Sequence, residues 1–359
     1  MKRILRLTGI ALLVLTAGVL LRGCNVHEWP EEDYGEVPFV LHLDFDTELP
    51  LYRTVNHTRG AGISRVSPSD CDIRYIVTVY RAGETRNPRS VTGGGGGRRY
   101  TFTRHYSEDL DRTVTIALEE GNWEIYVWAD YVDANSRRDK YFDTSDFGNI
   151  IYIDRQSYGG SNDSKDSFRG STSVRVVHPD RFLENEKLPS YEATVPMERP
   201  SGRFEFIATD VEAFLTRVAD VRSQSGDSAE TRSIDASEFR VVFRYNAFMP
   251  CSFNIFNDRP SNSWTGMWFE SRMSVRSEQE MLLGFDYVLV DADDETPMNI
   301  NVEIYDTDGS LLSVANGVEV PVRRGKLTVV KGEFLTSTGS GGVIVDPGFE
   351  GPDYNIEIH

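Results

Sequence analysis

Cysteine and histidine, the side chains that most often bind metals or form cross-links, are scarce in this chain. Its 359 residues include three cysteines and six histidines, and no two histidines lie within ten residues of each other. The H-E-x-x-H motif and the paired Cys–His spacings of zinc sites are therefore absent. We expect no metal, no cofactor and no disulfide framework, and we expect Cys71 and Cys251 to be small buried apolar residues.

Basic residues are also in the minority. The chain has 38 Lys and Arg against 56 Asp and Glu, which gives a formal net charge of −18. The first 24 residues contain four basic side chains and no acidic one, so the remaining chain carries 34 − 56 = −22. Phosphate backbones and anionic lipid surfaces attract clustered Lys and Arg. The charge balance therefore excludes nucleic acid as a partner and electrostatic docking on anionic lipid.

Signatures of the common enzyme classes are missing as well. Five consecutive glycines, Gly93–Gly97, are not followed by Lys-Ser or Lys-Thr, so they do not form a P-loop, and Arg98 breaks the dinucleotide-binding pattern. The G-x-S-x-G elbow of α/β-hydrolases does not occur either. A catalytic triad or a pair of catalytic carboxylates assembled from distant segments is the alternative. We nevertheless expect no enzyme and no catalytic residues.

The N-terminus has the pattern of a secretory signal. Leu7 to Leu21 form a 15-residue apolar run, which is shorter than the about 20 residues of a membrane-spanning helix. The run ends in Leu21-Arg22-Gly23-Cys24, which resembles a bacterial lipobox, although Arg22 replaces the usual small residue. We expect residues 1–23 to be a lipoprotein signal peptide and Cys24 to carry the lipid, a palmitate-type acyl group. The alternative is cleavage elsewhere, with Cys24 incidental.

An acidic segment follows, with Glu28, Glu31, Glu32 and Asp33 close to the cysteine. We assign residues 24–36 to a solvated tether. The cluster of acids resembles the export signal that places lipoproteins of Bacteroidota on the outer face of the outer membrane. We therefore expect a lipid-anchored protein of the cell outer membrane that is exposed at the surface. A periplasm-facing anchor is the alternative.

Alternating apolar and polar residues recur through the rest of the chain. Such period-2 segments, separated by Gly, Asp and Asn, predict a mainly β protein built from antiparallel β-sandwiches. Apolar residues spaced as on one face of a helix occur once, after residue 209, and predict a helix that ends near Ser223. The clearest strand segments are Phe39–Phe45, Ile73–Val79, Trp123–Val127, Phe239–Tyr245 and Ile300–Ile304, and the helix positions are Val211, Phe214, Leu215 and Val218.

Length and proline placement suggest two domains. A domain typically has about 150 residues, so a chain of 359 residues is long enough for two domains, each with its own core. Pro196 and Pro200 stiffen the segment between them. We expect an N-terminal β-sandwich domain at 37–195, a linker at 196–201 and a C-terminal β-sandwich domain at 202–359, with one or two short helices.

Two sets of side chains are candidate contact or processing sites. Trp264 and Trp268 lie near Pro260 and Gly266 and are candidates for stacking on a glycan or a partner, with core packing as the alternative. Arg53, Arg59 and Arg65 lie in a polar segment and are candidate protease sites, although loop arginines usually serve solubility.

Longer phrases of the sequence resemble a known family, the fimbrillin-like lipoproteins of Bacteroides and relatives, in a subfamily of largely uncharacterised function. The resemblance covers nearly the whole chain after the signal. The phrases that carry it are Cys24-Asn25-Val26-His27-Glu28-Trp29-Pro30, Val40-Leu41-His42-Leu43-Asp44-Phe45, Trp128-Ala129-Asp130-Tyr131, Asp166-Ser167-Phe168-Arg169-Gly170, Met197-Glu198-Arg199-Pro200 and Gly284-Phe285-Asp286-Tyr287-Val288.

The resemblance implies two tandem transthyretin-like β-sandwich domains. It also implies subunits that assemble into a type V-like pilus by strand exchange, and anchors that keep their lipid and hold the fimbria to the outer membrane. We expect a fimbrial anchor or subunit that acts in pilus assembly or adhesion and binds other fimbrillin-like subunits by strand addition. The strands first considered for exchange are Phe39–Asp46 and Tyr354–His359, because chain ends exchange most readily. A surface glycan-binding lipoprotein is the alternative.

Overall fold

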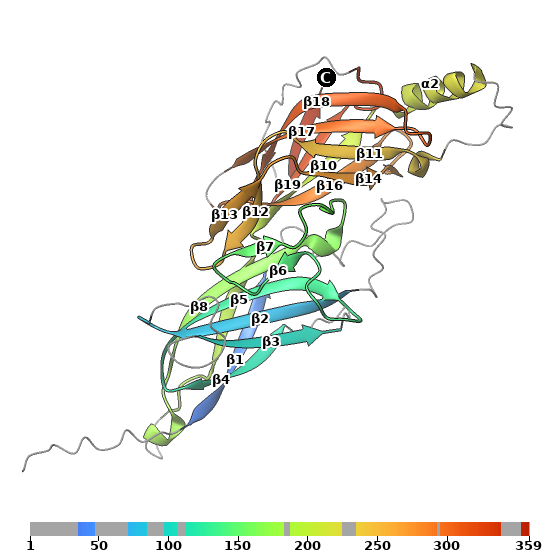
Figure 1. Ribbon diagram of the computed structural model, residues 1–359. Coiled ribbons are helices and arrows are strands. Elements are labelled where there is room, and N and C mark those ends of the chain that lie inside the picture. The colour runs from blue at the N-terminus through green and yellow to red at the C-terminus, as the bar shows by residue number, and fades with distance from the viewer. Residues whose placement is uncertain are drawn as a thin grey trace, which may run out of the picture. The chain divides into compact units, whose positions relative to one another are not determined.

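A computed structural model describes residues 35–46, 71–84, 97–105, 112–182, 187–224, 235–292 and 295–338, and the backbone of 353–358 (Figure 1). Of these residues, 58% are in strands, and they contain one α-helix. The predicted mainly β fold is therefore confirmed. The strands are β1 (Glu36–Phe45), β2 (Cys71–Arg81), β3 (Arg98–Arg104), β4 (Thr113–Glu119), β5 (Gly121–Asp133), β6 (Phe142–Asp143), β7 (Ile150–Tyr152), β8 (Ser167–Val176), β9 (Glu192–Glu198), β10 (Ser201–Ala208), β11 (Arg240–Tyr245), β12 (Met249–Asn254), β13 (Arg259–Trp264), β14 (Trp268–Arg272), β15 (Ser274–Val275), β16 (Met281–Leu289), β17 (Thr296–Tyr305), β18 (Leu311–Val322), β19 (Leu327–Gly332) and β20 (Asp353–Ile358); the helices are α2 (Val211–Gln224) and the 3-10 turns η2 (Asp163–Lys165), η3 (Pro179–Arg181) and η4 (Ala236–Glu238).

The first half of the chain forms a seven-stranded sheet in the order β3-β2-β5-β8-β9-β1-β4. Side chains of β2 alternate between two hydrophobic clusters, because successive residues of a strand point to opposite faces. Tyr75 and Val77 lie in a cluster with β1 and β4, whereas Ile76 and Tyr80 lie in a second cluster. Almost all of β2 is therefore buried, and its second face meets another layer of protein.

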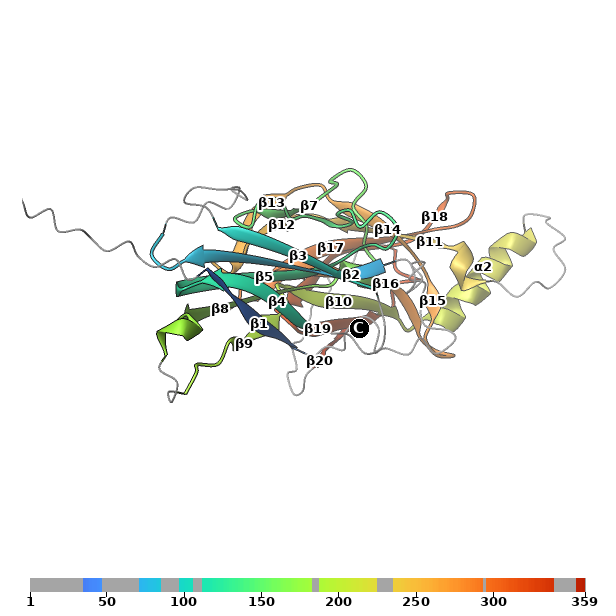
Figure 2. The ribbon, with the colours of Figure 1, turned by 90° about the horizontal axis from the view of Figure 1, so that it is seen from below.

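β1 lies inside this sheet, between β4 and β9 (Figure 2). Its inward side chains are all at most 6% exposed and belong to the first-half cluster; they are Val37, Phe39, Leu41, Leu43 and Phe45. The alternation read from the sequence thus identifies the buried face of this strand correctly.

The sheets are mixed, which differs from the expected antiparallel pairing. β1 pairs with β9 in parallel, and β19 pairs in parallel with both β10 and β20. Each of these pairs joins segments that are distant in sequence, so the chain has room for the crossover that parallel strands require. Alternation specifies which face of a strand is buried but carries no information about the direction of its neighbour.

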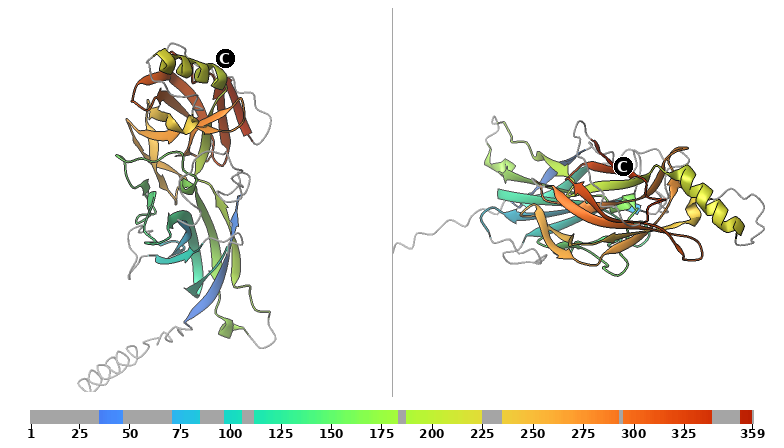
Figure 3. Two further views of the ribbon diagram at one scale, coloured as in Figure 1. Left: turned by 90° about the vertical axis from the view of Figure 1, so that its right-hand side faces the viewer. Right: turned by 90° about the horizontal axis from the view of Figure 1, so that it is seen from above.

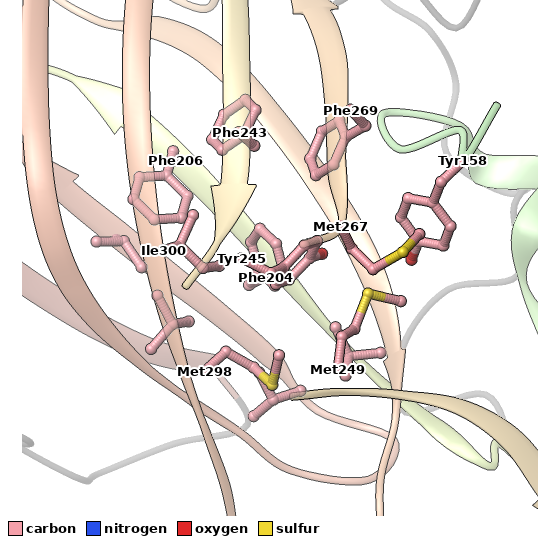
Figure 4. Packing of buried hydrophobic residues seen from close by; sticks show 14 of the residues in the cluster. Tyr158, Phe204, Phe206, Phe243, Tyr245, Met249, Met267, Phe269, Met298 and Ile300 are labelled. Atoms are coloured by element: carbon pink, nitrogen blue, oxygen red, sulfur yellow. The ribbon is translucent and has the colours of Figure 1, made fainter. Parts of the chain in front are cut away.

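The second half contains a five-stranded sheet, β15-β16-β10-β19-β20, and a four-stranded sheet, β14-β11-β17-β18. Aromatic and sulfur-containing side chains fill the space between them (Figure 4). Phe206 of β10 packs edge-to-face on Phe243 of β11 with ring centroids 5.4 Å apart, and Phe243 stacks on Phe269 of β14 at 4.7 Å. The two sheets therefore form a sandwich.

A fourth sheet, β13-β12-β7-β6, joins strands from both halves of the sequence. Ile151 of β7 pairs with Ser252 of β12, and Ile150 pairs with Phe253. The larger hydrophobic cluster likewise contains residues from both halves, and Val37–His359 forms one compact unit by its contacts. The halves therefore share a core and a sheet.

The expected linker is shorter than predicted. Residues 196–198 form the end of β9, and β10 begins at Ser201. Arg199, between the two strands, is 1% exposed. The division into domains 37–195 and 202–359 stays a prediction.

The predicted helix is confirmed as α2, Val211–Gln224, which lies at one end of the second-half sheets (Figure 3). Phe214 packs against Phe239 with ring centroids 5.0 Å apart. Arg217 donates hydrogen bonds to the carbonyls of Leu312 and Leu335 at 3.1 and 2.7 Å. The apolar face of the helix and this cation together hold it against the sandwich.

Candidate functional site

The structure separates the two tryptophans that the sequence places together. Trp264 ends β13 in the sheet shared by the two halves, is half-buried and packs against the larger cluster. Trp268 begins β14 in a different sheet and is 43% exposed. Trp264 therefore has a packing role, and Trp268 is the tryptophan that a ligand can reach. Cys24, Arg53, Arg59 and Arg65 lie outside the described residues.

Open strand edges are the second candidate for partner binding, because an edge presents unpaired backbone N–H and C=O groups. In the seven-stranded sheet the edges are β3 and β4. Three arginines along β3 protect its edge from unwanted pairing: Arg98, Arg99 and Arg104. Side chains also connect the two edges, since the Tyr100 hydroxyl donates to the Ala117 carbonyl at 2.6 Å and Arg98 forms an ion pair with Glu119.

β20 is one edge of the five-stranded sheet, where β19 is its neighbour among the described strands. Its backbone pairs in parallel with Leu327–Gly332 over six residues, from Leu327↔Asp353 to Gly332↔Ile358. Parallel pairing is slightly less stable per residue than antiparallel pairing. Among the described residues, β20 is thus paired on one side, and its other side is a sheet edge.

β1, the other candidate for exchange, is in a different situation. Burying one such apolar side chain contributes about 1.5–3 kcal/mol to the free energy of unfolding, so the five side chains of β1 contribute about 8–15 kcal/mol. The free energy of unfolding of a whole domain is typically about 5–15 kcal/mol. β1 therefore cannot leave the sheet unless an equivalent strand replaces it.

A buried ionic network lies between η2 and β16. Lys165 and Asp286 form an ion pair with Nζ and Oδ1 2.7 Å apart, and both side chains are 1% exposed. The hydroxyls of Tyr158 and Tyr245 donate to Oδ2 of Asp286 at 2.7 and 2.6 Å. The Lys165 ammonium also contacts the Tyr158 hydroxyl and lies 4.5 Å from the ring centroid of Tyr152.

Burial dominates the titration of this network. It lowers the pKa of Lys165 from 10.5 to about 8, against the opposing attraction of Asp286. It also raises the pKa of Tyr158 and Tyr245 well above 10. Perturbed groups of this kind often mark catalytic sites. Here the lysine and the carboxylate bind each other and the surrounding phenols inside the core, so we interpret the network as a structural joint between the two halves.

A second buried pair lies next to the first. Arg199 binds Asp166 through Nε at 3.0 Å and Nη2 at 2.9 Å, and both side chains are at most 1% exposed. Asp163, the first residue of η2, forms an ion pair with Arg203 of β10. Three charged residues of a four-residue segment thus each bind an opposite charge on a later segment. The sequence gives no local signal for these partners, because 33 or more residues separate each pair.

Cavities in the described part of the chain are a further kind of candidate site. One of 460 Å³ lies where β1 and β9 end, with Asp44, Asp46, Arg199 and Arg324 in its lining. A smaller one of 130 Å³ lies beside Tyr152 and Lys165. Within the described ranges, no group of three or more metal-ligating side chains occurs. In the same part of the chain, no helix is long and apolar enough to cross a membrane. Cys71 and Cys251 are both buried, as expected for small core residues, and burial raises the pKa of Cys251 to about 11.

A family model described as "Family of unknown function (DUF6562)" matches residues 35–359. The chain belongs to this family. The comparison with curated proteins gave no significant match.

Solved structures similar to this member of the DUF6562 family include three surface-type proteins. A candidate adhesin from Bacteroides thetaiotaomicron has a TM-score of 0.39 and 9% identity and covers 79% of each chain. The fimbrial anchor protein Mfa2 from Porphyromonas gingivalis has a TM-score of 0.36 and 9% identity and covers 78% of this chain and 82% of its own. A candidate cell adhesion protein from Bacteroides eggerthii has a TM-score of 0.39 and 11% identity, with coverages of 90% and 95%. Its structural neighbours are thus of the kind that the sequence resemblance named.

Two features of this DUF6562 protein are the candidates for binding considered below: the β20 edge, through backbone groups, and the sheet face around the exposed Trp268, through side chains. The first suits a strand of another protein. The second is a set of polar and aromatic side chains on a rigid sheet.

Proposed function

We propose that this protein is a non-enzymatic surface lipoprotein of fimbrial type, either the anchor or a subunit, that acts in pilus assembly or adhesion. Its lipid on Cys24 holds it in the outer membrane, on the outer face. It binds other fimbrillin-like subunits by strand addition. The proposal includes the two tandem transthyretin-like sandwiches that the resemblance implies. The edge strands of their sheets are the places where a strand of another subunit would add.

The observation that carries the proposal is the position of β20. An edge strand that pairs with one strand of the described chain can leave and be replaced without rearranging the interior strands. Backbone hydrogen bonds along β19 would supply affinity for the replacing strand, and alternate side-chain positions would supply the choice of partner. β1 is the less suitable strand, because its removal takes five buried apolar side chains out of one core.

A disulfide that locks β20 in place tests this role. Leu327 and Asp353 are backbone partners, so Leu327→Cys with Asp353→Cys should form a cross-link between the two strands. We expect the oxidised variant to be displayed on cells but to form no higher complexes with co-expressed subunits, and we expect a reductant to restore them.

The matched control places the same cross-link between strands that do not exchange. Asn122 of β5 and Arg175 of β8 are exposed backbone partners, so Asn122→Cys with Arg175→Cys should leave assembly unchanged. Normal assembly by the oxidised β20 variant would show that this strand is not exchanged. A protein recovered only as a free monomer from cells would argue against the fimbrial function altogether.

The N-terminus of the protein recovered from cells separates anchor from subunit. A lipidated Cys24 on the assembled protein favours an anchor. A start after Arg53, Arg59 or Arg65 favours a processed subunit, because the protease would then have removed the first strand.

A further inference from the structure

The outer face of the four-stranded sheet β14-β11-β17-β18 has a distinct composition. Phe243 of β11 and Phe269 of β14 point into the core (Figure 4). Their neighbours Arg244 and Trp268 therefore point to the opposite face, where the Arg244 side chain is 44% and Trp268 is 43% exposed. A large aromatic ring and a guanidinium thus lie side by side on an accessible surface.

These side chains form a row across three strands. Arg244 pairs with Trp268 on one side and with Asn301 of β17 on the other. Neighbouring strands lie about 4.8 Å apart, so the row from Trp268 to Asn301 spans about 10 Å. The Arg244 guanidinium lies 5.7 Å from the ring centroid of Trp268 and donates through Nε to both carboxylate oxygens of Glu303 at 2.9 and 3.0 Å. These contacts hold the arginine beside the ring.

Two further asparagines, Asn246 and Asn299, lie next to Asn301 and extend the row. Asn246 Nδ2 donates to Oδ1 of Asn299 at 2.6 Å and to Oδ1 of Asn301 at 2.5 Å. The backbone N–H of Gly317 donates to the same Asn301 oxygen at 2.8 Å. Gly317 has a φ of +69°, a conformation that glycine adopts without strain and that aims this N–H at the asparagine.

The glycine N–H fixes which way all three amides face. A backbone N–H can only donate, so the Asn301 atom that it meets must be the oxygen. The Asn246 atom on that oxygen must then be the nitrogen, and the Asn299 atom beside it must be the oxygen. Among the described residues, Asn246 Oδ1 and the Nδ2 groups of Asn299 and Asn301 have no hydrogen-bond partner. One acceptor and two donors are therefore held ready on the face.

We infer that this face, around Trp268, Arg244, Asn246, Asn299 and Asn301, binds a neutral oligosaccharide. The apolar side of a sugar ring packs on an aromatic ring, while each sugar hydroxyl can both donate and accept, which matches a mixed set of fixed amide donors and acceptors. The hydrogen bonds among the side chains orient them before a ligand arrives, which reduces the entropy lost on binding.

Charge favours a neutral ligand over an acidic one. The two glutamates in the next row of the face, Glu270 and Glu303, are each neutralised by an ion pair, with Arg240 and Arg244. An acidic chain would have to compete for these arginines and would also meet the net charge of −18 that the whole chain carries. The inference does not depend on strand exchange, since it needs only that the sheet face be accessible, and it would give a fimbrial protein its adhesive specificity.

The test is a glycan array of neutral oligosaccharides built from glucose, galactose, mannose, xylose and N-acetylhexosamines, probed with the purified full-length protein. The strongest binder is then titrated by calorimetry. We expect Trp268→Ala to weaken its binding by about tenfold or more, Asn299→Ala to weaken it by a smaller factor, and Trp268→Phe to restore most of the binding because it keeps an aromatic surface.

The matched control is Leu311→Ala. Leu311 is 53% exposed on β18 of the same sheet, at the turn that joins it to β17, and its loss should leave binding unchanged. Circular dichroism would verify that each variant keeps its fold. The inference is wrong if no oligosaccharide on the array binds, if Trp268→Ala and Asn299→Ala bind as the wild type does, or if Leu311→Ala weakens binding as much as Trp268→Ala.

Discussion

Replacing Lys165 by methionine removes the charge from the buried joint between η2 and β16 while keeping a side chain of similar length. The carboxylate of Asp286 would remain in the core with the two tyrosine hydroxyls as partners but without its cation. Breaking a buried ion pair in this way costs about 3–5 kcal/mol. Burial already penalises the lysine charge in the wild type, and the two phenols still hydrogen-bond the carboxylate, so at pH 7 we expect a loss below this range, about 2 kcal/mol.

Urea unfolding followed by circular dichroism and tryptophan fluorescence measures this loss. The double variant Lys165→Met with Asp286→Leu should recover much of it, because a pair of apolar side chains carries no uncompensated charge. Lys331→Met is the matched control: Lys331 binds Glu280 at 2.9 Å with both side chains about 30% exposed, and we expect its loss to cost at most about 1 kcal/mol. A Lys165→Met variant as stable as the control, or single effects that simply add, would refute the reasoning.

The same lysine gives a pH dependence with a definite sign. Its pKa is about 8 in the folded protein and 10.5 ordinarily, so between these values the unfolded chain binds the proton and the folded chain does not. The contribution of this lysine to stability should therefore rise with pH across this window. The buried tyrosines, whose pKa values lie well above 10, act in the opposite direction near pH 10, but they are common to both proteins compared here. Between pH 7.5 and 10 a shift of this size raises the stability of the wild type relative to Lys165→Met by about 2 kcal/mol. Unfolding free energies of the two proteins at pH 7.5 and 10 measure it, and a constant difference between them would contradict the assignment.

Three further predictions concern the anchor, the core and the domains. Cys24→Ala should abolish labelling of the protein with a fatty-acid analogue on cells, and equal labelling of wild type and variant would remove the lipid anchor. Leu41→Ala should lower the free energy of unfolding by about 2–5 kcal/mol, because the side chain is fully buried. His42→Ala, on the exposed face of the same strand, should change it by less than about 1 kcal/mol. Similar losses in the two variants would mean that the buried face of β1 does not stabilise the core. The fragment 202–359 contains both sheets of the second-half sandwich. We therefore expect this β-rich fragment to unfold cooperatively in urea, at a lower midpoint than the full chain. A fragment that behaves as an unfolded chain would refute the domain division.

Much of the architecture could be predicted from local patterns. Alternation identified β1 and the central part of β2, and helical spacing identified α2 to within a residue of its end. These features depend on side chains a few residues apart, whose spacing decides which face of a strand or helix can be buried.

The candidate sites were less accessible to such reasoning. Trp264 and Trp268 are equally attractive in sequence, but they belong to different sheets, and only Trp268 has Arg244 and the asparagines beside it. Asn246 and Asn301 are separated by 55 residues, and neither has a motif that would single it out. A side chain becomes part of a binding face only through the strands that bring its neighbours.

The amino-acid sequence by itself determined which segments are strands, which of their faces are apolar, and the acidic net charge. Only the tertiary structure decided that β1 and β9 run in parallel, that β7 and β12 share a sheet, and that Lys165 meets Asp286 across 121 residues. The physical reason is that hydrophobic periodicity is a local property, whereas strand order and ion pairing depend on contacts between distant residues. Many sequences with the same alternation could satisfy those contacts in other ways.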